Sequence, residues 1–372
     1  MKHVPELDGL RGLAVTLVIF HHYLNHPALS LYGPRWGWAG VNLFFVLSGY
    51  LITSILLRTR ASQSPIKTFY ARRILRIFPL YYLVVLFWLA CSAILHTPQS
   101  WKTAAYYLLF LQAVVSPHAI HLWIIPHPVW ADYPVLWSLS VEEVFYLLWA
   151  PLVIWMVARN RILIRCLIGV LVVAPVIRYF YIFYPTPAGI QQTFLGQMDS
   201  LAAGALLAIL WMLHAEDMRT WGQAHARWLN AMIGILLAGA ICLDLALGVH
   251  LKTPMHLRIF DTFEYTLLWA AWSMLLFSAL VWSGQQRMLT RFLRNRTLCW
   301  LGKISYCLYL VHVACFMFWR EHLPHIIALP ASLVSSLAIA ALSWKYLEGP
   351  IMNWKKTHAQ YVGAKSDLQV SA

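Results

Sequence analysis

The sequence predicts an all-α fold, namely a polytopic transmembrane helical bundle of about ten spans with one short re-entrant or interfacial segment. Hydrophobic residues make up 60% of the 372 residues and charged residues only 11%, which excludes an ordinary soluble domain. Several apolar runs approach the ~20 residues that a helix needs to cross a bilayer. Basic residues gather in the short segments between these runs, as in multi-pass membrane proteins.

The expected spans follow one another along the chain. The first, about 9–26, comes after only eight residues and lacks a small-residue cleavage site, so we expect a retained span. The second and third, about 38–57 and 77–95, enclose the most basic segment, 58–76. The others lie at about 137–157, 162–183, 194–213, 228–249, 260–282, 303–320 and 329–348. The apolar run 103–115 is too short to cross, which favours a re-entrant or interfacial segment.

The charge distribution predicts an orientation. If 103–115 does not cross, the positive-inside rule places most of the 28 Lys and Arg residues, and both termini, in the cytoplasm. The net charge of +14 then reports topology, and we expect no nucleic-acid partner. We expect residues 1–352 to form one membrane domain and 353–372 a cytoplasmic polar tail. The six cysteines show no CxxC pairing, which is typical of small core residues.

The first span carries two ionisable residues at a spacing that places them on one face. Arg11 and His22 would lie about 16 Å apart along a helix and within roughly 20° of the same stripe. Ionisable groups inside membrane spans usually line a cavity or pathway. The alternative is that Arg11 pairs with Asp8 and reaches the headgroups, while His21 and His22 sit at the opposite interface.

The segment FYARRILRIFPLYY, residues 69–82, contains three arginines at helical spacing. On a helix, Arg73 and Arg76 are i,i+3 neighbours and Arg72 and Arg76 are i,i+4 neighbours. Together they would present guanidinium groups that bind phosphate at the cytoplasmic membrane face. The alternative is that these arginines serve only as a topology signal.

Two adjacent carboxylates open the span WSLSVEEVFYLLW, residues 137–149. Glu142 and Glu143 would point about 100° apart, so one of them can face a given cavity. In the predicted topology they lie near the outer face, as does His22, and one carboxylate is expected to orient its imidazole. The alternative is a pair of interfacial acids at a helix N-terminus.

Other ionisable residues carry weaker signals. His118, His121 and His127 lack the spacing and acidic partners of a metal site, so no metal is expected. Asp199 is expected to be a polar core residue. For His312, a structural and a functional role both stay open.

The first span with Arg11 and His22 is followed in order by GVNLFFVLSGYLI, FYARRILRIFPLYY, WSLSVEEVFYLLW and LGKISYCLYLVH. Together these five motifs resemble the acyltransferase-3 family of integral-membrane carbohydrate O-acyltransferases, over about residues 5–350. The ending Glu348-Gly349-Pro350 departs from the usual Glu-Arg-Pro of that family. Cys307 and Ala314 stand where Ser and Pro are often found. None of these departures lies in the first span, in GVNLFFVLSGYLI or in FYARRILRIFPLYY.

The resemblance implies transfer of an acyl group, usually acetyl from acetyl-CoA, onto a hydroxyl of a carbohydrate or glycoside. It implies no bound cofactor beyond this donor substrate, and a site in the bacterial inner membrane among its lipids. The family patterns carry over to Arg11, His22, Arg73 and Arg76, with His22 as general base and an acetyl-histidine intermediate as a variant. The other hypothesis is a proton-coupled transporter or flippase of a glycolipid or small solute, because intramembrane Arg, His and Glu also suit a proton relay.

Overall fold

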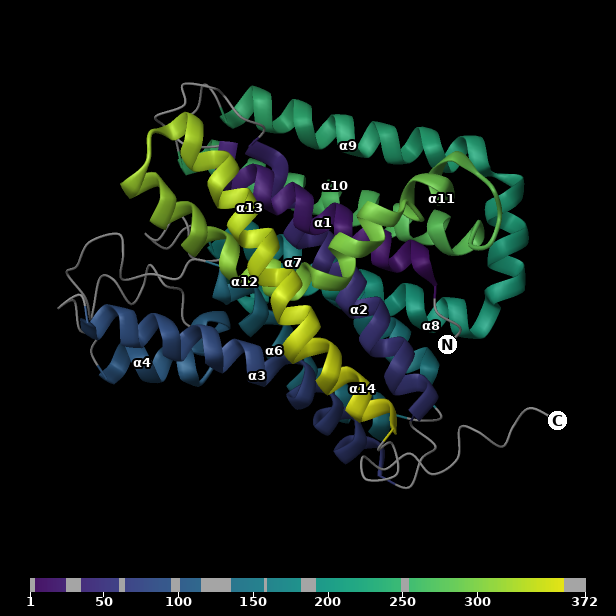
Figure 1. Ribbon diagram of the computed structural model, residues 1–372. Helices are drawn as coiled ribbons and strands as arrows, with labels where there is room; N and C mark the ends of the chain where they lie inside the picture. Colours follow the sequence, from purple (N-terminus) through teal and green to yellow (C-terminus); the bar gives the residue numbers. More distant parts are fainter. Residues whose placement is uncertain are drawn as a thin grey trace.

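The structure, a computed structural model, describes residues 4–24, 35–59, 64–94, 101–114, 135–156, 159–181, 192–248 and 254–357. Within these ranges the chain forms helices and no strand, and the helices pack into one bundle (Figure 1). Nine of the described helices are long and apolar enough to cross a membrane. The helix α1 (Pro5–Leu24) is not among them, since its charged residues and histidines make it less apolar. The predicted all-α transmembrane bundle is confirmed.

The other long helices lie close to the expected spans. They are α2 (Ala39–Thr59), α3 (Pro65–Ile94), α6 (Leu136–Trp155), α7 (Asn160–Tyr181), α8 (Phe194–Ala224), α9 (Ala226–Gly248), α10 (Pro254–Val281), α12 (Arg296–His322) and α13 (His325–Ser343). The shorter elements are η2 (Arg35–Trp38), α4 (Trp101–Leu108), η3 (Leu111–Ala113), α11 (Met288–Leu293), η6 (Trp344–Glu348) and α14 (Gly349–Thr357). The helical path thus continues past residue 352, the expected end of the membrane domain, as far as Thr357.

Several helices are longer than the expected spans, most of all α3, α8 and α12. The helix α3 begins at Pro65, so the second half of the expected basic loop is helical. The helix α8 runs for 31 residues, with a kink at His214. No Gly or Pro follows the kink before Gly222, so the backbone meets no strong helix breaker there.

The short apolar run at 103–115 forms α4 and η3. Eight helical residues rise only about 12 Å, too little to cross a bilayer. The hydroxyl of Tyr81 on α3 donates to the carbonyl oxygen of Tyr107 at 2.6 Å. The ring of Phe110 stacks on Tyr81 with a centroid distance of 4.1 Å. The segment is therefore a short element anchored on α3, as the expected fold required.

Glycines permit a close crossing between α2 and α8. A Cβ atom on Gly49 of α2 would lie 2.0 Å from the carbonyl oxygen of Leu201, and one on Gly204 of α8 would lie 1.9 Å from that of Val46. Only residues without a side chain allow this backbone approach. Gly49 is thus a point at which α2 approaches α8 closely.

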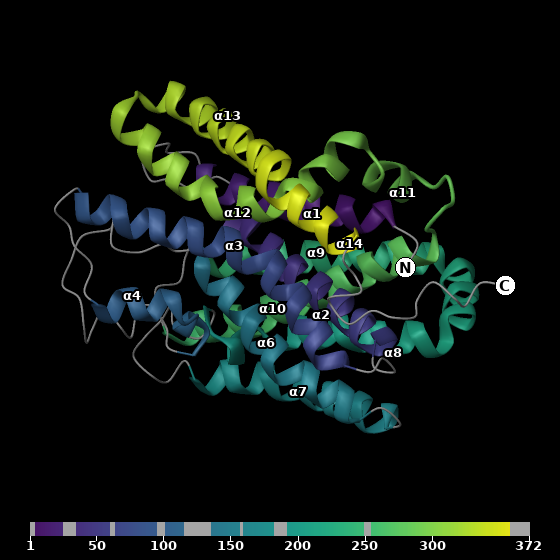
Figure 2. The same cartoon turned by 60° about the horizontal axis from the view of Figure 1, so that its bottom comes forward.

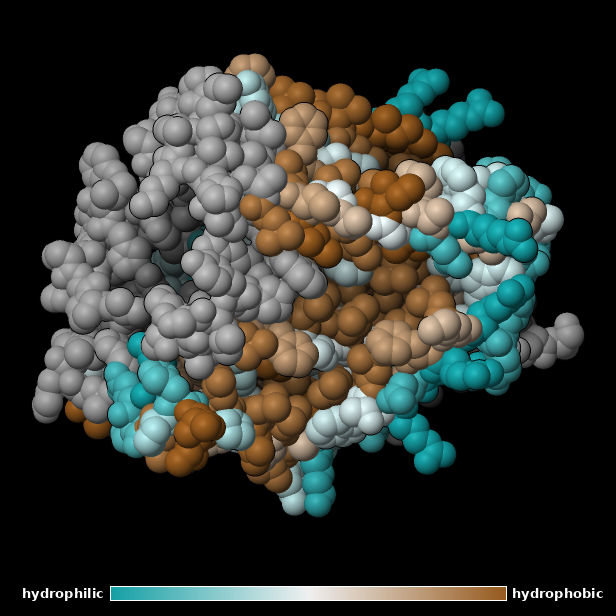
Figure 3. All heavy atoms as spheres, turned by 90° about the horizontal axis from the view of Figure 1, so that it is seen from above, coloured by the Kyte–Doolittle hydropathy of each residue, from teal (hydrophilic) through white to brown (hydrophobic). Residues whose placement is uncertain are grey.

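The surface carries a broad apolar band. Figure 3 shows this band next to a hydrophilic end of the molecule. Large apolar side chains such as Phe87 and Trp155 are 70% and 77% exposed. Such exposure suits contact with lipid tails. Cys166 and Cys242 also lie exposed, so the core placement expected for cysteines holds only for Cys307 and Cys315.

One ion pair is fully enclosed in the bundle. Arg178 of α7 donates to Asp199 of α8 at 2.7 Å, and both side chains have 0% exposure. Arg178 also donates to the carbonyl oxygen of Gly196 at 2.8 Å. Asp199 is thus a polar core residue, as expected, and its partner is an arginine whose burial the sequence did not indicate.

Candidate functional site: three adjoining cavities along α1 and α12

The helix α1 occupies the middle of the bundle in two views, and α12 packs along it (Figures 1 and 2). Glycines again allow the backbones of the two helices to approach closely. A Cβ on Gly12 would lie 2.0 Å from the carbonyl oxygen of Leu298, and one on Gly302 would lie 1.9 Å from that of Asp8. This approach brings the Arg11–His22 face of α1 close to polar side chains of α12.

The polar residues of α12 recur every three positions and mark three cavities in order. We name the cavities after one lining residue each. Lys303 and Tyr306 line the Lys303 cavity, Tyr306 and Tyr309 line the Arg73 cavity, and Tyr309 also lines the His22 cavity. Neighbouring cavities therefore share a tyrosine wall.

The Lys303 cavity, of about 430 Å³, lies where α1 and α12 begin. Arg11, Arg76 and Lys303 line it together with the acidic residues Asp8 and Glu348. Glu348 ends η6, a π-helical turn, and accepts a hydrogen bond from Ser343 at 3.0 Å. Cationic side chains outnumber acidic ones here, so the cavity suits an anion.

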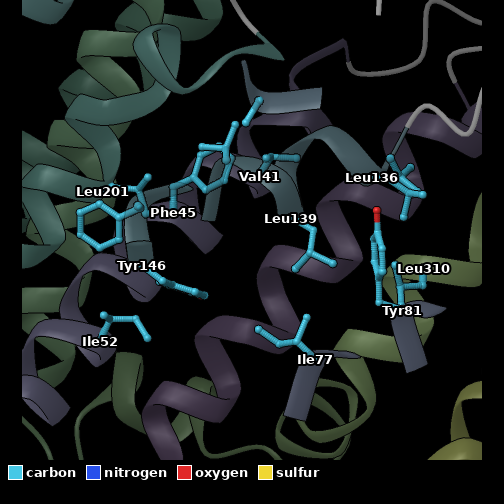
Figure 4. Packing of buried hydrophobic residues seen from close by; sticks show 14 of the residues in the cluster. Val41, Phe45, Ile52, Ile77, Tyr81, Leu136, Leu139, Tyr146, Leu201 and Leu310 are labelled. Carbon is cyan, nitrogen blue, oxygen red and sulfur yellow. The ribbon is translucent and has the colours of Figure 1, made fainter. Parts of the chain in front are cut away.

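The Arg73 cavity, of about 160 Å³, is enclosed mainly by apolar walls. Figure 4 shows Ile77, Leu139 and Tyr146 around this part of the core. Its charged residues are Arg11, Arg73, Arg76 and Glu142.

Hydrogen bonds and a ring contact hold two of these charged groups. Glu142 accepts from Ser48 and from Tyr146, each at 2.6 Å. The guanidinium of Arg73 lies 5.2 Å from the centroid of the Tyr146 ring, an arrangement that favours a cation over an aromatic face. Glu142 and Arg73 are thus positioned through the same tyrosine.

The His22 cavity, of about 280 Å³, differs in its chemistry. Its walls are formed by His21, His22, Trp38, Val41, Asn42, Val135, Trp137, Gln192, Gln197, Tyr265 and Tyr309. Among these lining residues there is no Asp, Glu, Lys or Arg. Aromatic faces and amide groups dominate instead, and Asn42 donates to Gln197 at 3.1 Å.

His22 is held at one ring nitrogen. Its Nδ1 lies 3.0 Å from the carbonyl oxygen of Val18 and 3.2 Å from Nε2 of His312. The rings of His22 and His312 have centroids 4.9 Å apart. Nδ1 of His312 in turn lies 2.7 Å from the carbonyl oxygen of Tyr309.

The predicted site residues thus divide between adjoining cavities. Arg11, Arg73, Arg76 and Glu142 meet around the Arg73 cavity, and His22 lies in the next one. Arg72 is not among the residues that line the Arg73 cavity.

The expected partnership between a glutamate and His22 needs a correction. Glu142 binds Ser48 and Tyr146, and Oε1 of Glu143 is buried without a hydrogen-bond partner among the described residues. His312 takes the place beside His22, because α12 packs along α1 whereas α6 packs against α2.

His21 belongs to the same site. Although one residue from His22, it lines the same cavity, and the two rings meet edge to face with centroids 5.2 Å apart. The signal for α12 was present in the sequence: Lys303, Tyr306, Tyr309 and His312 repeat every three residues within an apolar helix.

No metal site emerges in the ranges that the structure covers. They contain no group of three or more His, Cys, Asp or Glu residues that could hold a metal ion. The three histidines weighed for this role, His118, His121 and His127, lie outside the described residues.

These features define a multi-pass membrane protein whose polar site lies between its helices. A family model described as an acyltransferase domain matches residues 4–345. The chain therefore belongs to the acyltransferase-3 family.

Three curated relatives are similar to the chain over 94% of its length. Peptidoglycan O-acetyltransferase OatA of Listeria monocytogenes serovar 1/2a is 29% identical, and 56% of that protein is covered. YrhL of Bacillus subtilis, whose name marks the same activity as provisional, is 27% identical with 55% covered. O-acetyltransferase OatA of Staphylococcus aureus (strain NCTC 8325 / PS 47) is 26% identical with 57% covered. The chain spans about half the length of these relatives, and no solved structure matches it.

Proposed function

We propose that this chain is a membrane O-acetyltransferase that moves an acetyl group from acetyl-CoA to a hydroxyl of a carbohydrate or glycoside. The observation that carries the proposal is the row of three adjoining cavities, which begins at cationic residues and ends at His22. Membership of the acyltransferase family and the names of the relatives support the same reaction class.

The Lys303 cavity is the proposed site for the phosphates of CoA. Arg11, Arg76 and Lys303 offer three cationic groups to it, and guanidinium binds phosphate through paired N–H donors. Arg76 lines both this cavity and the next, so it is the arginine of α3 best placed for this contact.

The acyl arm of the donor would then pass along the Arg73 cavity. Its walls are mostly apolar, which suits an uncharged pantetheine chain. Arg11 and His22 lie about 16 Å apart along α1, a separation that an extended arm of this kind can span. Arg73 and Glu142 line this passage and would contact the amide groups of the arm.

The His22 cavity is the proposed acceptor site. The rings of Trp38 and Trp137 offer faces on which a sugar ring can stack, and Asn42 and Gln197 offer amide groups for its hydroxyls. A lining without charged side chains suits a neutral glycan. The relatives are named for action on peptidoglycan, so we propose a cell-wall or other surface glycan as the acceptor.

The chemical step would use His22 as general base. Its free nitrogen takes the proton of the acceptor hydroxyl as the oxygen attacks the thioester carbonyl. The carbon–sulfur bond then breaks, and the CoA thiolate leaves and takes the proton from the imidazolium.

We also propose the bacterial inner membrane, with both termini in the cytoplasm. In support, Asp8 at the start of α1 and Met352 of α14 line the same cavity, so both ends of the described chain lie on one side. Cysteine labelling at position 160 tests this orientation. Labelling from the periplasmic side would contradict it.

The test of the reaction uses purified protein in nanodiscs with acetyl-CoA and a neutral chito-oligosaccharide. We expect release of free CoA that depends on the acceptor, an acetyl increment on the sugar by mass spectrometry, and loss of both in His22→Gln. Protein that moves solute but releases no CoA with any glycan acceptor would favour the transporter hypothesis instead. Mass spectrometry of surface glycans from cells with and without the gene would identify the natural acceptor.

A further inference from the structure

His312 is a buried histidine whose two ring nitrogens are both engaged. Its side chain has no solvent exposure. Nδ1 lies 2.7 Å from the carbonyl oxygen of Tyr309 and Nε2 lies 3.2 Å from Nδ1 of His22. His312 is also not among the residues that line the His22 cavity. Neither nitrogen is free to contact a substrate, so an effect of His312 on the reaction passes through His22.

The hydrogen-bond partners determine where the protons lie. A carbonyl oxygen only accepts, so Nδ1 of His312 carries a hydrogen and donates to Tyr309. In neutral His312 the lone pair is then on Nε2. By the same rule Nδ1 of His22 carries a hydrogen for the carbonyl oxygen of Val18. That hydrogen is shared with Nε2 of His312, and the lone pair of neutral His22 remains on its Nε2.

The surrounding contacts fix the two rings relative to each other. The hydroxyl of Tyr23, the residue after His22, donates to the carbonyl oxygen of His312 at 3.1 Å. The same hydroxyl lies 2.9 Å from Oγ of Ser336 on α13. The ring of Tyr23 stacks on Phe316 with centroids 5.0 Å apart. The end of α1 is thus joined to α12 and α13 directly beside the histidine pair.

We propose that His312 is the positioning residue of the site, which holds His22 in the tautomer whose Nε2 lone pair is free for the acceptor hydroxyl. This rests on the proposed role of His22 as base. The same bond persists when His22 becomes an imidazolium, because its Nδ1–H still donates to His312. A general base is commonly oriented by a third group in this way, and here the third group is a neutral imidazole.

The test compares two substitutions of similar size. His312→Leu removes one of the two acceptors for Nδ1–H of His22 and leaves only the carbonyl oxygen of Val18. His312→Gln keeps a side-chain carbonyl oxygen that can take the place of the lost acceptor. We expect His312→Leu to lower kcat by about a hundredfold, less than the ~10⁴-fold seen when the charged member of a serine-protease triad is replaced. KM for acetyl-CoA should stay within about twofold, because His312 lines none of the cavities. His312→Gln should recover kcat to within about tenfold of the wild type. His322→Leu is the control, because His322 is exposed on the same helix, and the contacts described for it are with Phe318, through the carbonyl oxygen and the ring.

A second measurement does not depend on turnover. Nitrogen-15 NMR of histidine-labelled protein in liposomes distinguishes the two tautomers, and His22→Gln identifies the His22 signals. We expect the Nδ1–H form in the wild type and in His312→Gln, and a mixture of tautomers in His312→Leu. An unchanged tautomer in His312→Leu, or equal loss of kcat in the Leu and Gln variants, would overturn the inference. If the wild type transfers no acetyl group, the proposed function fails, and the NMR result still decides whether His312 positions His22.

Discussion

The Lys303 and His22 cavities lie along the same two helices yet differ in charge. Arg11, Arg76 and Lys303 line the first, whereas aromatic rings, amides and imidazoles line the second. Away from bulk water an unpaired charge is costly, so each cavity selects the polarity of its ligand. The proposed function uses this difference, with the anionic donor at the charged end of the helix pair and the neutral acceptor at the uncharged end.

Removal of the proposed base in the His22 cavity should have the largest effect. His22→Ala should lower acetyl transfer by about 10²–10⁴-fold, because a general base typically contributes that much. KM for acetyl-CoA should change little, since the cationic residues lie in the other cavities. The protein should still insert and purify. Substantial turnover in well-expressed His22→Ala protein would contradict the mechanism. His21→Ala should cause a smaller loss, because His21 lines the same cavity but is not the proposed base.

The buried ion pair of Arg178 and Asp199 tests what stabilises the bundle near the His22 cavity. Asp199→Ala should lower stability by about 3–5 kcal/mol, because it leaves the buried charge of Arg178 unpaired. A thermal melt in detergent measures this change. The double variant Arg178→Leu with Asp199→Leu should be more stable than Asp199→Ala alone. A melting temperature unchanged in Asp199→Ala would show that the ion pair does not stabilise the bundle.

The charged cavity can be tested through donor affinity. Arg76→Ala and Lys303→Ala should each raise KM for acetyl-CoA roughly ten- to a hundredfold, since a hydrogen bond to a charged group contributes about 1.5–3 kcal/mol. Arg76→Lys should recover part of the loss. Arg72→Ala should have a smaller effect, because Arg72 lines neither the Lys303 cavity nor the Arg73 cavity. Lys67→Ala is the control on the exposed surface of α3. If all these variants kept the wild-type KM for acetyl-CoA, the arginines would serve only as a topology signal.

The smallest expected effect concerns the acceptor. Trp137→Leu should raise KM for a chito-oligosaccharide about two- to tenfold, because aromatic contacts contribute about 0.5–1.5 kcal/mol beyond the buried area. KM for acetyl-CoA should not change. Trp155→Leu, on the same helix but 77% exposed, should alter neither. A rise in donor KM alone would place the acceptor elsewhere.

Much of the fold could be predicted from residue order alone. Hydropathy and run length identify helices and spans, because a bilayer requires every spanning backbone to satisfy its own hydrogen bonds. The spacing of Arg73 and Arg76 likewise indicated a shared helix face, since helical periodicity is local. The structure gives both residues a place around one cavity with Arg11 and Glu142.

Only the tertiary structure decided which residues meet across helices. His22 and His312 are 290 positions apart, Ser48 and Glu142 are 94 apart, and Arg178 and Asp199 belong to neighbouring helices. Periodicity defines the face of each helix but not the face of its partner. That choice depends on the depth and rotation at which helices pack, which small residues such as Gly12 and Gly302 control. For this reason a glutamate was expected beside His22, and the packed bundle placed His312 there.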